Sequence, residues 1–195
     1  MSSIKVKSLK NNIAIGTAIP TPYTKADNGV GIWAEDQLAE NGHNVDTRGT
    51  VDLPDLGVEN KTKKRGSNSA WTQGSMTIND ILATPDFLDT KIWEKMKNQN
   101  QITWDGQLQT VVDVELVNMD IEETRSLLQE SWQDVRDQLL QGSRDKSVTS
   151  SNKAMILDGY NNDTSYNIRI TTTAMNKIRT ISRTNNALNQ HFEWK

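Results

Sequence analysis

The spacing of apolar residues predicts two amphipathic helices. Apolar side chains recur every three or four positions over residues 28–41 and again over residues 121–141, as one buried helical stripe requires. The stripes consist of Val30, Ile32, Trp33, Ala34, Leu38 and Ala39 in the first helix and Leu127, Leu128, Trp132, Val135, Leu139 and Leu140 in the second. Asn41-Gly42 and Gly142 follow the stripes and are typical helix stops.

Shorter alternating stretches predict strands. Residues 45–52 and 58–64 indicate two strands joined by a bend at residues 54–57, and residues 67–77 are expected to form another strand of the same sheet. Further strands are expected over residues 102–118, 154–157 and 166–172, and a helix over residues 84–96 with Pro85 near its first turn. Residues 160–189, rich in Asn, Thr and Arg, are interpreted as a polar tail, suited either to base edges or to a solvated sheet edge.

These elements indicate an α/β fold in one domain, residues 1–195, with one lobe or two. Residues 1–27 are expected to form an extended N-terminal arm, because Pro20 and Pro22 keep the residues before them out of the helical region. No apolar stretch approaches 18 residues, which predicts no membrane insertion, no secretion and an intracellular protein. The absence of Cys and the presence of only two His exclude thiolate chemistry and a multi-histidine metal site.

Three charged residues form the most informative pattern. Glu59 and Lys61 lie two positions apart in a predicted strand, so their side chains should project from one face. Asp52 precedes the bend and would join them if the two strand ends lie side by side. Two converging carboxylates suit Mg²⁺, which also binds waters and phosphate oxygens. Asp52 and Glu59 are therefore predicted metal ligands, and Lys61 is predicted to orient a water or stabilise developing charge during phosphodiester hydrolysis.

Asp55 is an alternative first carboxylate. We favour Asp52, because the sequence Pro54-Asp55-Leu56-Gly57 is typical of the turn itself. A solvated strand face would also accommodate all of these charges.

The predicted metal site is followed by basic residues. Lys63, Lys64 and Arg65 are predicted to contact backbone phosphates of the substrate, although a solvated strand end would look the same. The overall net charge is −3, so any attraction for nucleic acid must come from such a local basic surface.

The segment Asp52-Leu-Pro-Asp-Leu-Gly-Val-Glu-Asn-Lys-Thr62 resembles the active-site segment of the MutH mismatch-repair endonucleases and related restriction enzymes. The pattern there is Asp, six residues, Glu, one residue and Lys. Three further similarities support the resemblance: Gly31-x-x-x-Glu35, Lys95-Met96-Lys97 followed by Trp104, and Asn167-Ile168-Arg169.

The resemblance implies a PD-(D/E)xK restriction-endonuclease-like fold, with a mixed central sheet flanked by helices and a DNA cleft. It implies Mg²⁺-dependent, sequence-specific cleavage of double-stranded DNA by a cytoplasmic protein of prokaryotic or phage origin, acting as a monomer or homodimer. It gives Glu35 a supporting catalytic role and assigns a further active-site lysine to Lys95, with Lys97 as the alternative.

Two other functions fit the same residues. A structure-specific nuclease such as a Holliday junction resolvase also uses a helix Glu, an Asp and a Glu-x-Lys. A noncatalytic DNA-binding protein would carry the acidic residues as solvated surface groups. Comparing the cleavage of linear and of branched DNA distinguishes a sequence-specific from a structure-specific nuclease. The absence of any cleavage would identify the noncatalytic protein.

Overall fold

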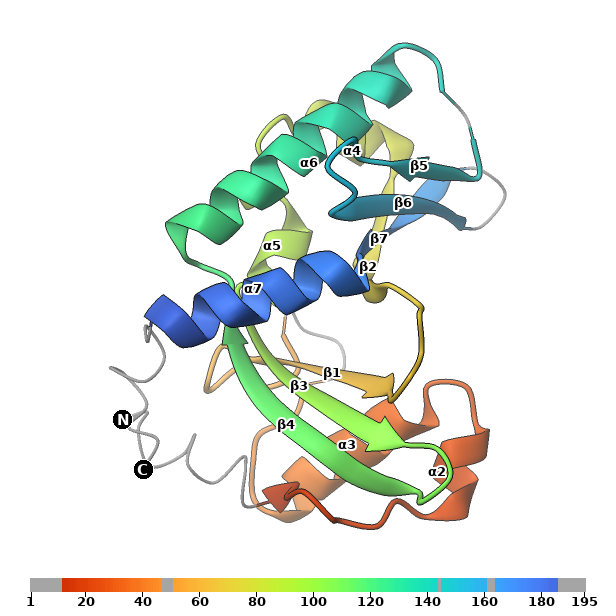
Figure 1. Ribbon diagram of the computed structural model, residues 1–195, viewed down its shortest axis with the longest axis vertical. Helices are drawn as coiled ribbons and strands as arrows, with labels where there is room; N and C mark the ends of the chain where they lie inside the picture. Colours follow the sequence, from red (N-terminus) through yellow and green to blue (C-terminus); the bar gives the residue numbers. More distant parts are fainter. Residues whose placement is uncertain (1–11, 47–50, 144, 161–163, 186–195) are drawn as a thin grey trace. The chain divides into compact units, whose positions relative to one another are not determined.

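The structure, a computed structural model, describes residues 12–46, 51–143, 145–160 and 164–185 (Figure 1). The chain divides into two compact units and crosses between them several times. Unit 1 comprises the described residues up to Ser67 together with Lys97–Asn118, and unit 2 comprises Asn68–Met96 and Met119–Asn185. Each unit has its own sheet, so two sheets replace the single central sheet that the sequence analysis expected.

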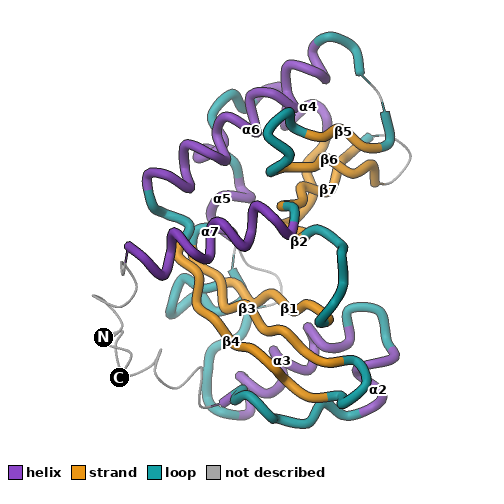
Figure 2. The backbone as a smooth tube through the Cα atoms, in the orientation of Figure 1, coloured by secondary structure: helices purple, strands orange, loops and turns teal. Residues whose placement is uncertain are grey.

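Unit 1 is built on a three-stranded mixed sheet in the order β1-β3-β4. Strand β1 pairs parallel to β3, and β3 pairs antiparallel to β4. The elements of this unit are α2 (Thr21–Lys25), α3 (Gly29–Glu40), β1 (Glu59–Lys64), β3 (Asn98–Asp105) and β4 (Thr110–Asn118). Figure 2 shows β3 and β4 as a long hairpin with β1 along its edge. Helix α3 begins after Asn28 and ends before Asn41, as the apolar spacing predicts.

The two faces of the unit 1 sheet differ in polarity. Because strand residues alternate, the face bearing Ile102 and Val114 packs with Trp33 and Leu38 of α3 in the hydrophobic core. The opposite face, which we call the polar face, carries mostly polar side chains in register across the strands. They are Glu59, Lys61 and Lys63 on β1, Gln99, Gln101 and Thr103 on β3, and Asp113 and Glu115 on β4.

The predicted extended arm is wrong over its described part, residues 12–27. Ile13 and Ile19 are buried in the core of unit 1, and Ala18 forms an antiparallel bridge with Thr110. Pro22 does not prevent helix α2, because a proline in the first turn has no intrahelical hydrogen bond to lose. The segment is therefore part of unit 1.

Unit 2 combines an antiparallel sheet in the order β2-β7-β6-β5 with several helices. The long helix α6 (Glu122–Leu140) contacts β5 and β6, and its bounds match the prediction within one residue at each end. The other elements are β2 (Trp71–Thr77), α4 (Ile78–Ala83), the 3₁₀ helix η1 (Phe87–Asp89), α5 (Lys91–Met96), β5 (Ser147–Thr149), β6 (Met155–Tyr160), β7 (Ser165–Ile170) and α7 (Thr172–Asn185).

Several predicted elements are corrected by the structure. Strand β2 belongs to the sheet of unit 2, not to the sheet of β1. The helix expected over residues 84–96 is divided into η1 and α5, because Thr90 is extended and its hydroxyl caps the backbone N–H of Trp93. The strand expected over residues 102–118 is two strands, β3 and β4, of which β3 begins earlier, at Asn98. Residues 172–185, expected to be polar tail, form helix α7.

The fold is thus a mixed α/β arrangement with two sheets flanked by helices, while its PD-(D/E)xK type and a DNA cleft stay predictions. Among the described helices, none is long and apolar enough to cross a membrane.

Candidate active site in unit 1

A tight hairpin brings the two predicted metal ligands together. Leu53 and Val58 form an antiparallel bridge, so the next pair outward, Asp52 and Glu59, lie opposite each other. Leu53 and Val58 point into the core, which turns Asp52 and Glu59 to the other side. Gly57 closes the turn with φ of 64°, a left-handed conformation that favours glycine. The six-residue spacing between the two carboxylates is therefore the spacing of this hairpin.

Hydrogen bonds hold the two carboxylates in place. The backbone N–H of Asn60 donates to Asp52 Oδ2 over 2.9 Å, and the backbone N–H of Asp52 donates to Glu59 Oε2 over 3.3 Å. Lys61 Nζ lies 2.7 Å from Glu59 Oε1. The Glu59 side chain is only 4% exposed and the Lys61 side chain 20%, so water screens this ion pair weakly. The predicted trio of Asp52, Glu59 and Lys61 is one cluster.

Glu35 on α3 belongs to the same electrostatic environment. Burial raises the pKa of the Glu35 carboxyl above its ordinary value of 4.5, and the negative charges of Asp52, Glu59 and, more weakly, Asp36 raise it further. Lys61 acts in the opposite direction and lowers this pKa. Glu35 therefore lies close enough to the trio to feel all three of its charges, the position that the Gly31-x-x-x-Glu35 similarity suggests.

Neutralising Glu35 should stabilise the folded protein near pH 7. A carboxyl whose pKa is higher in the folded than in the unfolded protein lowers the free energy of unfolding as pH rises above 4.5. The reason is that the unfolded protein then releases this proton more readily than the folded protein does. Glu35→Gln, measured with a chelator present, should raise the free energy of unfolding at pH 7 by up to about 1 kcal/mol, since Glu35 is half-buried and partly screened. The gain should be seen as a higher thermal midpoint. The gain should shrink toward pH 4.

Glu40→Gln, at the exposed end of α3, is the matched control and should leave the midpoint nearly unchanged. A Glu35→Gln midpoint at or below that of the wild type at pH 7 would show that Glu35 does not repel the other two carboxylates.

The donor set fits a Mg²⁺ ion. No group of three or more His, Cys, Asp or Glu side chains suited to a metal ion occurs in the described part of the chain. Mg²⁺ sites commonly use one or two carboxylates and complete their octahedron with waters and substrate phosphate oxygens. Asp52 and Glu59 supply such a pair, and Asp52 Oδ1 accepts no hydrogen bond from any described residue.

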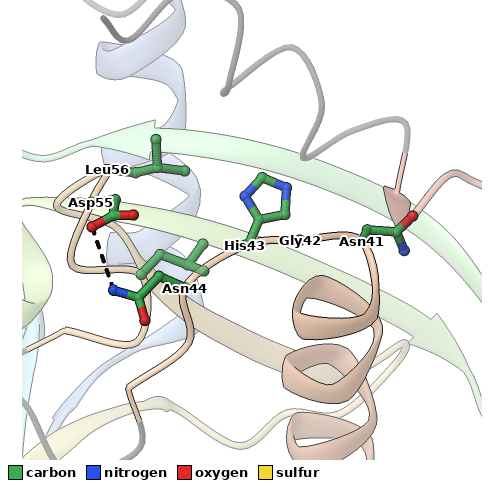
Figure 3. A pocket seen from close by; sticks show the side chains of 7 residues that line it. Asn41, Gly42, His43, Asn44, Asp55 and Leu56 are labelled. Atoms are coloured by element: carbon green, nitrogen blue, oxygen red, sulfur yellow. Dashed lines mark hydrogen bonds between the residues drawn. The ribbon is translucent and has the colours of Figure 1, made fainter.

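The alternative carboxylate, Asp55, lies in the turn, as the sequence pattern suggests. Its Oδ1 accepts a hydrogen bond of 3.4 Å from Asn44 Nδ2. Figure 3 shows this contact at one side of a pocket of about 160 Å³. The pocket is lined by Asn41, Gly42, His43, Asn44, Leu53, Asp55 and Leu56. Asp55 therefore faces Asn44, and this geometry favours Asp52 as the partner of Glu59.

The predicted DNA-binding residues continue β1 toward its end. Lys63 lies on the polar face, two positions beyond Lys61. Lys64 Nζ lies 5.7 Å from the centre of the Trp104 ring, and Arg65 Nη1 lies 3.9 Å from Asp105 Oδ2. Both Lys64 and Arg65 are solvent-exposed, so a phosphate can reach them. Their contact with DNA stays a prediction.

The two candidate lysines downstream fall in different units. Lys95 lies on α5 of unit 2. Lys97 directly precedes β3 in unit 1. Of the two, Lys97 is the one that shares a unit with Glu59.

A buried layer of amides beside the site was not predicted. Asn60 and Asn100 are paired in register, and Asn100 Nδ2 donates to Asn60 Oδ1 over 3.0 Å. On the polar face, Gln101 Nε2 donates to Gln99 Oε1 over 3.0 Å, and both glutamines are fully buried. The available signal was the run Asn98-Gln-Asn-Gln101 directly before Ile102. The Asn60–Asn100 hydrogen bond joins β1 to β3 on the core side of the sheet, whereas the Gln99–Gln101 pair lies within β3, on the polar face that also carries Glu59.

Parts of three predicted features lie outside the described residues: residues 1–11 of the N-terminal arm, residues 47–50 of the first strand, and residues 161–163 and 186–189 of the polar tail; His191, for which the sequence predicts no role, also lies outside them. Comparison with models of known protein families gives no match, and no curated protein matches the chain. The resemblance to the MutH-like nucleases therefore rests on the residues of this sequence alone.

Proposed function

We propose that this protein is a Mg²⁺-dependent, sequence-specific endonuclease that hydrolyses phosphodiester bonds of double-stranded DNA, in the manner of MutH-like or type II restriction enzymes. One observation carries the proposal: Asp52 and Glu59 face each other across the hairpin, and Lys61 Nζ lies 2.7 Å from Glu59. The same residues form the active-site pattern of the family that the sequence resembles.

Asp52 and Glu59 would hold the Mg²⁺ ion. When bound, the ion neutralises charge on the phosphate and lowers the pKa of a coordinated water. Asp52 is fixed for this role by the N–H of Asn60, and Glu59 by the N–H of Asp52 and by Lys61. Because hydrogen bonds already fix both carboxylates, little reorganisation is needed during the reaction.

Lys61 would act at the reacting phosphate. In hydrolysis, the oxygen of water bonds to phosphorus, one P–O ester bond breaks, and the released oxygen takes up a proton. The ammonium of Lys61 can orient the attacking water and stabilise the negative charge that develops on the phosphate oxygens. The Lys61 side chain is 20% exposed beside a buried carboxylate, so its charge is directed to the site while a substrate can still reach it.

Glu35 would support this arrangement rather than bind the metal alone. Burial raises its pKa, and the negative charges of Asp52 and Glu59 raise it further, so negative charge accumulates at this position. Such an excess attracts a divalent cation and is relieved by it. Lys63, Lys64 and Arg65 would contact the DNA backbone next to the scissile bond.

Cleavage should depend on Mg²⁺ and on linear duplex DNA. Purified protein is incubated with a linear duplex library and with branched DNA, with MgCl₂ or with EDTA, and the fragment ends are sequenced. We expect discrete fragments from the linear duplex with MgCl₂ and a loss of cleavage by at least about 10³-fold with EDTA.

Cleavage confined to branched DNA would instead identify a structure-specific nuclease. No cleavage of any DNA, combined with no rise of the thermal midpoint on adding MgCl₂, would indicate a noncatalytic protein.

A further inference from the structure

Helix α7 in unit 2 has one apolar face and one polar face. Ala174, Met175, Ile178 and Ser182 are buried. The opposite side, which we call the α7 polar face, is formed by the exposed residues Thr173, Asn176, Lys177, Thr180, Arg183 and Thr184. Their spacing of three or four residues places them on one continuous stripe, which is about 16 Å long at 1.5 Å per residue.

The charge of α7 is unlike that of the rest of the protein. The helix contains Lys177, Arg179 and Arg183 and no acidic residue, whereas the whole chain has a net charge of −3. Helix α6 of the same unit is predominantly acidic, with Glu122, Glu123, Glu130, Asp134 and Asp137 against Arg125 and Arg136. Unit 2 therefore separates positive from negative charge between two of its helices.

The packing of unit 2 explains only some of these cations. Arg179 lies over the Trp71 ring, 5.1 Å from its centre, and so is accounted for by packing. Arg183 lies in the last turn, where a cation also stabilises the helix dipole. Lys177 lies in the middle of the helix, away from the last turn, and is exposed. The carboxylate of Glu123 accepts a hydrogen bond from Asn185 at the end of the helix, beyond this stripe.

We infer that the α7 polar face is a second DNA-binding surface, which contacts the phosphate backbone of duplex DNA through Lys177 and Arg183. Charge complementarity selects a polyanion, since a stripe with cations and no anion attracts phosphates. Asn176 adds an amide donor next to Lys177. A helix of 10–12 Å diameter also matches the major groove, which is about 12 Å wide. The inference rests on the proposed function, which makes duplex DNA the substrate.

The test is the salt dependence of DNA binding. Binding of wild type and of the double variant Lys177→Gln/Arg183→Gln to a fluorescent duplex is measured by anisotropy in EDTA between 50 and 200 mM salt. Each phosphate contact contributes about 0.9 to the slope of log K against log salt. The double variant should flatten the slope by about 1.8 and weaken binding roughly tenfold or more at about 0.1 M salt.

The matched control is Lys91→Gln/Lys146→Gln, which removes the same charge from exposed positions of unit 2 outside α7. Its slope of log K against log salt should differ from that of the wild type by less than about 0.5. A further variant, Asn176→Lys, adds a cation to the same face and should steepen the slope by about 0.9. This gain tests the surface even if the double variant does not fold.

The inference would be overturned if the α7 double variant and the control double variant lost DNA affinity equally. It would also be overturned if the α7 double variant bound DNA like the wild type and Asn176→Lys did not steepen the salt slope. If wild-type protein still cleaves DNA in MgCl₂ in those cases, the nuclease proposal stands and only the role of α7 is lost. If wild-type protein neither cleaves nor binds duplex DNA, both fail.

Discussion

Lys61→Ala should abolish DNA cleavage while leaving DNA binding largely intact. The substitution removes the ammonium beside Glu59, the group that we expect to orient the water and stabilise the reacting phosphate. Loss of one such group typically lowers the chemical rate by roughly 10²- to 10⁴-fold. The measurement is single-turnover cleavage in MgCl₂, with binding followed separately by anisotropy in EDTA.

Lys63→Ala is the matched control for this experiment. Lys63 lies on the same face of β1 and carries the same charge, but it is one position further from the carboxylates along that face. Its loss should weaken binding modestly and leave the chemical step within about threefold of the wild type. Circular dichroism verifies that both variants fold, because removing Lys61 leaves the buried Glu59 without its ion-pair partner. If a folded Lys61→Ala protein cleaved DNA at the wild-type rate, Lys61 would have no role in the mechanism.

The core of the site was predictable because its geometry is local. Asp52 and Glu59 meet through a hairpin closed by Pro54 and Gly57, residues whose backbone preferences are visible in the sequence. Glu59 and Lys61 share a face through strand alternation alone. Glu35 is different, since no local rule connects a helix residue to this hairpin. Its position was expected only from the family resemblance.

The fold was less predictable wherever strands had to choose distant partners. Nothing within residues 71–77 says that β2 pairs with β7 rather than with β1, because both choices satisfy the same alternation. The start of β3 is not predictable from apolar alternation, because the run Asn98–Gln101 has none; Gln99, Asn100 and Gln101 are buried as hydrogen-bonded amides instead.

Helix α7 was overlooked for a different reason. Its sequence is rich in Thr, Asn and Ser, which favour turns and caps over helix interiors. The spacing of Ala174, Met175, Ile178 and Ile181 nevertheless matches a helical stripe. Packing of that stripe within unit 2 outweighs the weak intrinsic preference, as tertiary contacts commonly do.

Trp132→Ala should cause the largest loss of stability. Trp132 on α6 is fully buried, its ring lies 5.4 Å from that of Phe87, and its Nε1 donates to the carbonyl of Thr84 over 2.9 Å. Truncation of a buried aromatic residue leaves a cavity and typically costs about 3–5 kcal/mol. The carbonyl of Thr84 would also lose its partner, which costs about 1 kcal/mol or more. Urea unfolding followed by circular dichroism measures the loss.

Two variants of α6 separate the causes of this loss. Trp132→Phe keeps an aromatic ring beside Phe87 but lacks the hydrogen bond to Thr84, so it should lose less stability than Trp132→Ala. Glu130→Ala changes an exposed position of the same helix and should stay within about 0.5 kcal/mol of the wild type. Hydrogen exchange in Trp132→Ala should rise in β5 and β6, the strands that α6 contacts. If Trp132→Ala has the same urea midpoint of unfolding as Glu130→Ala, α6 is not anchored to unit 2 through Trp132.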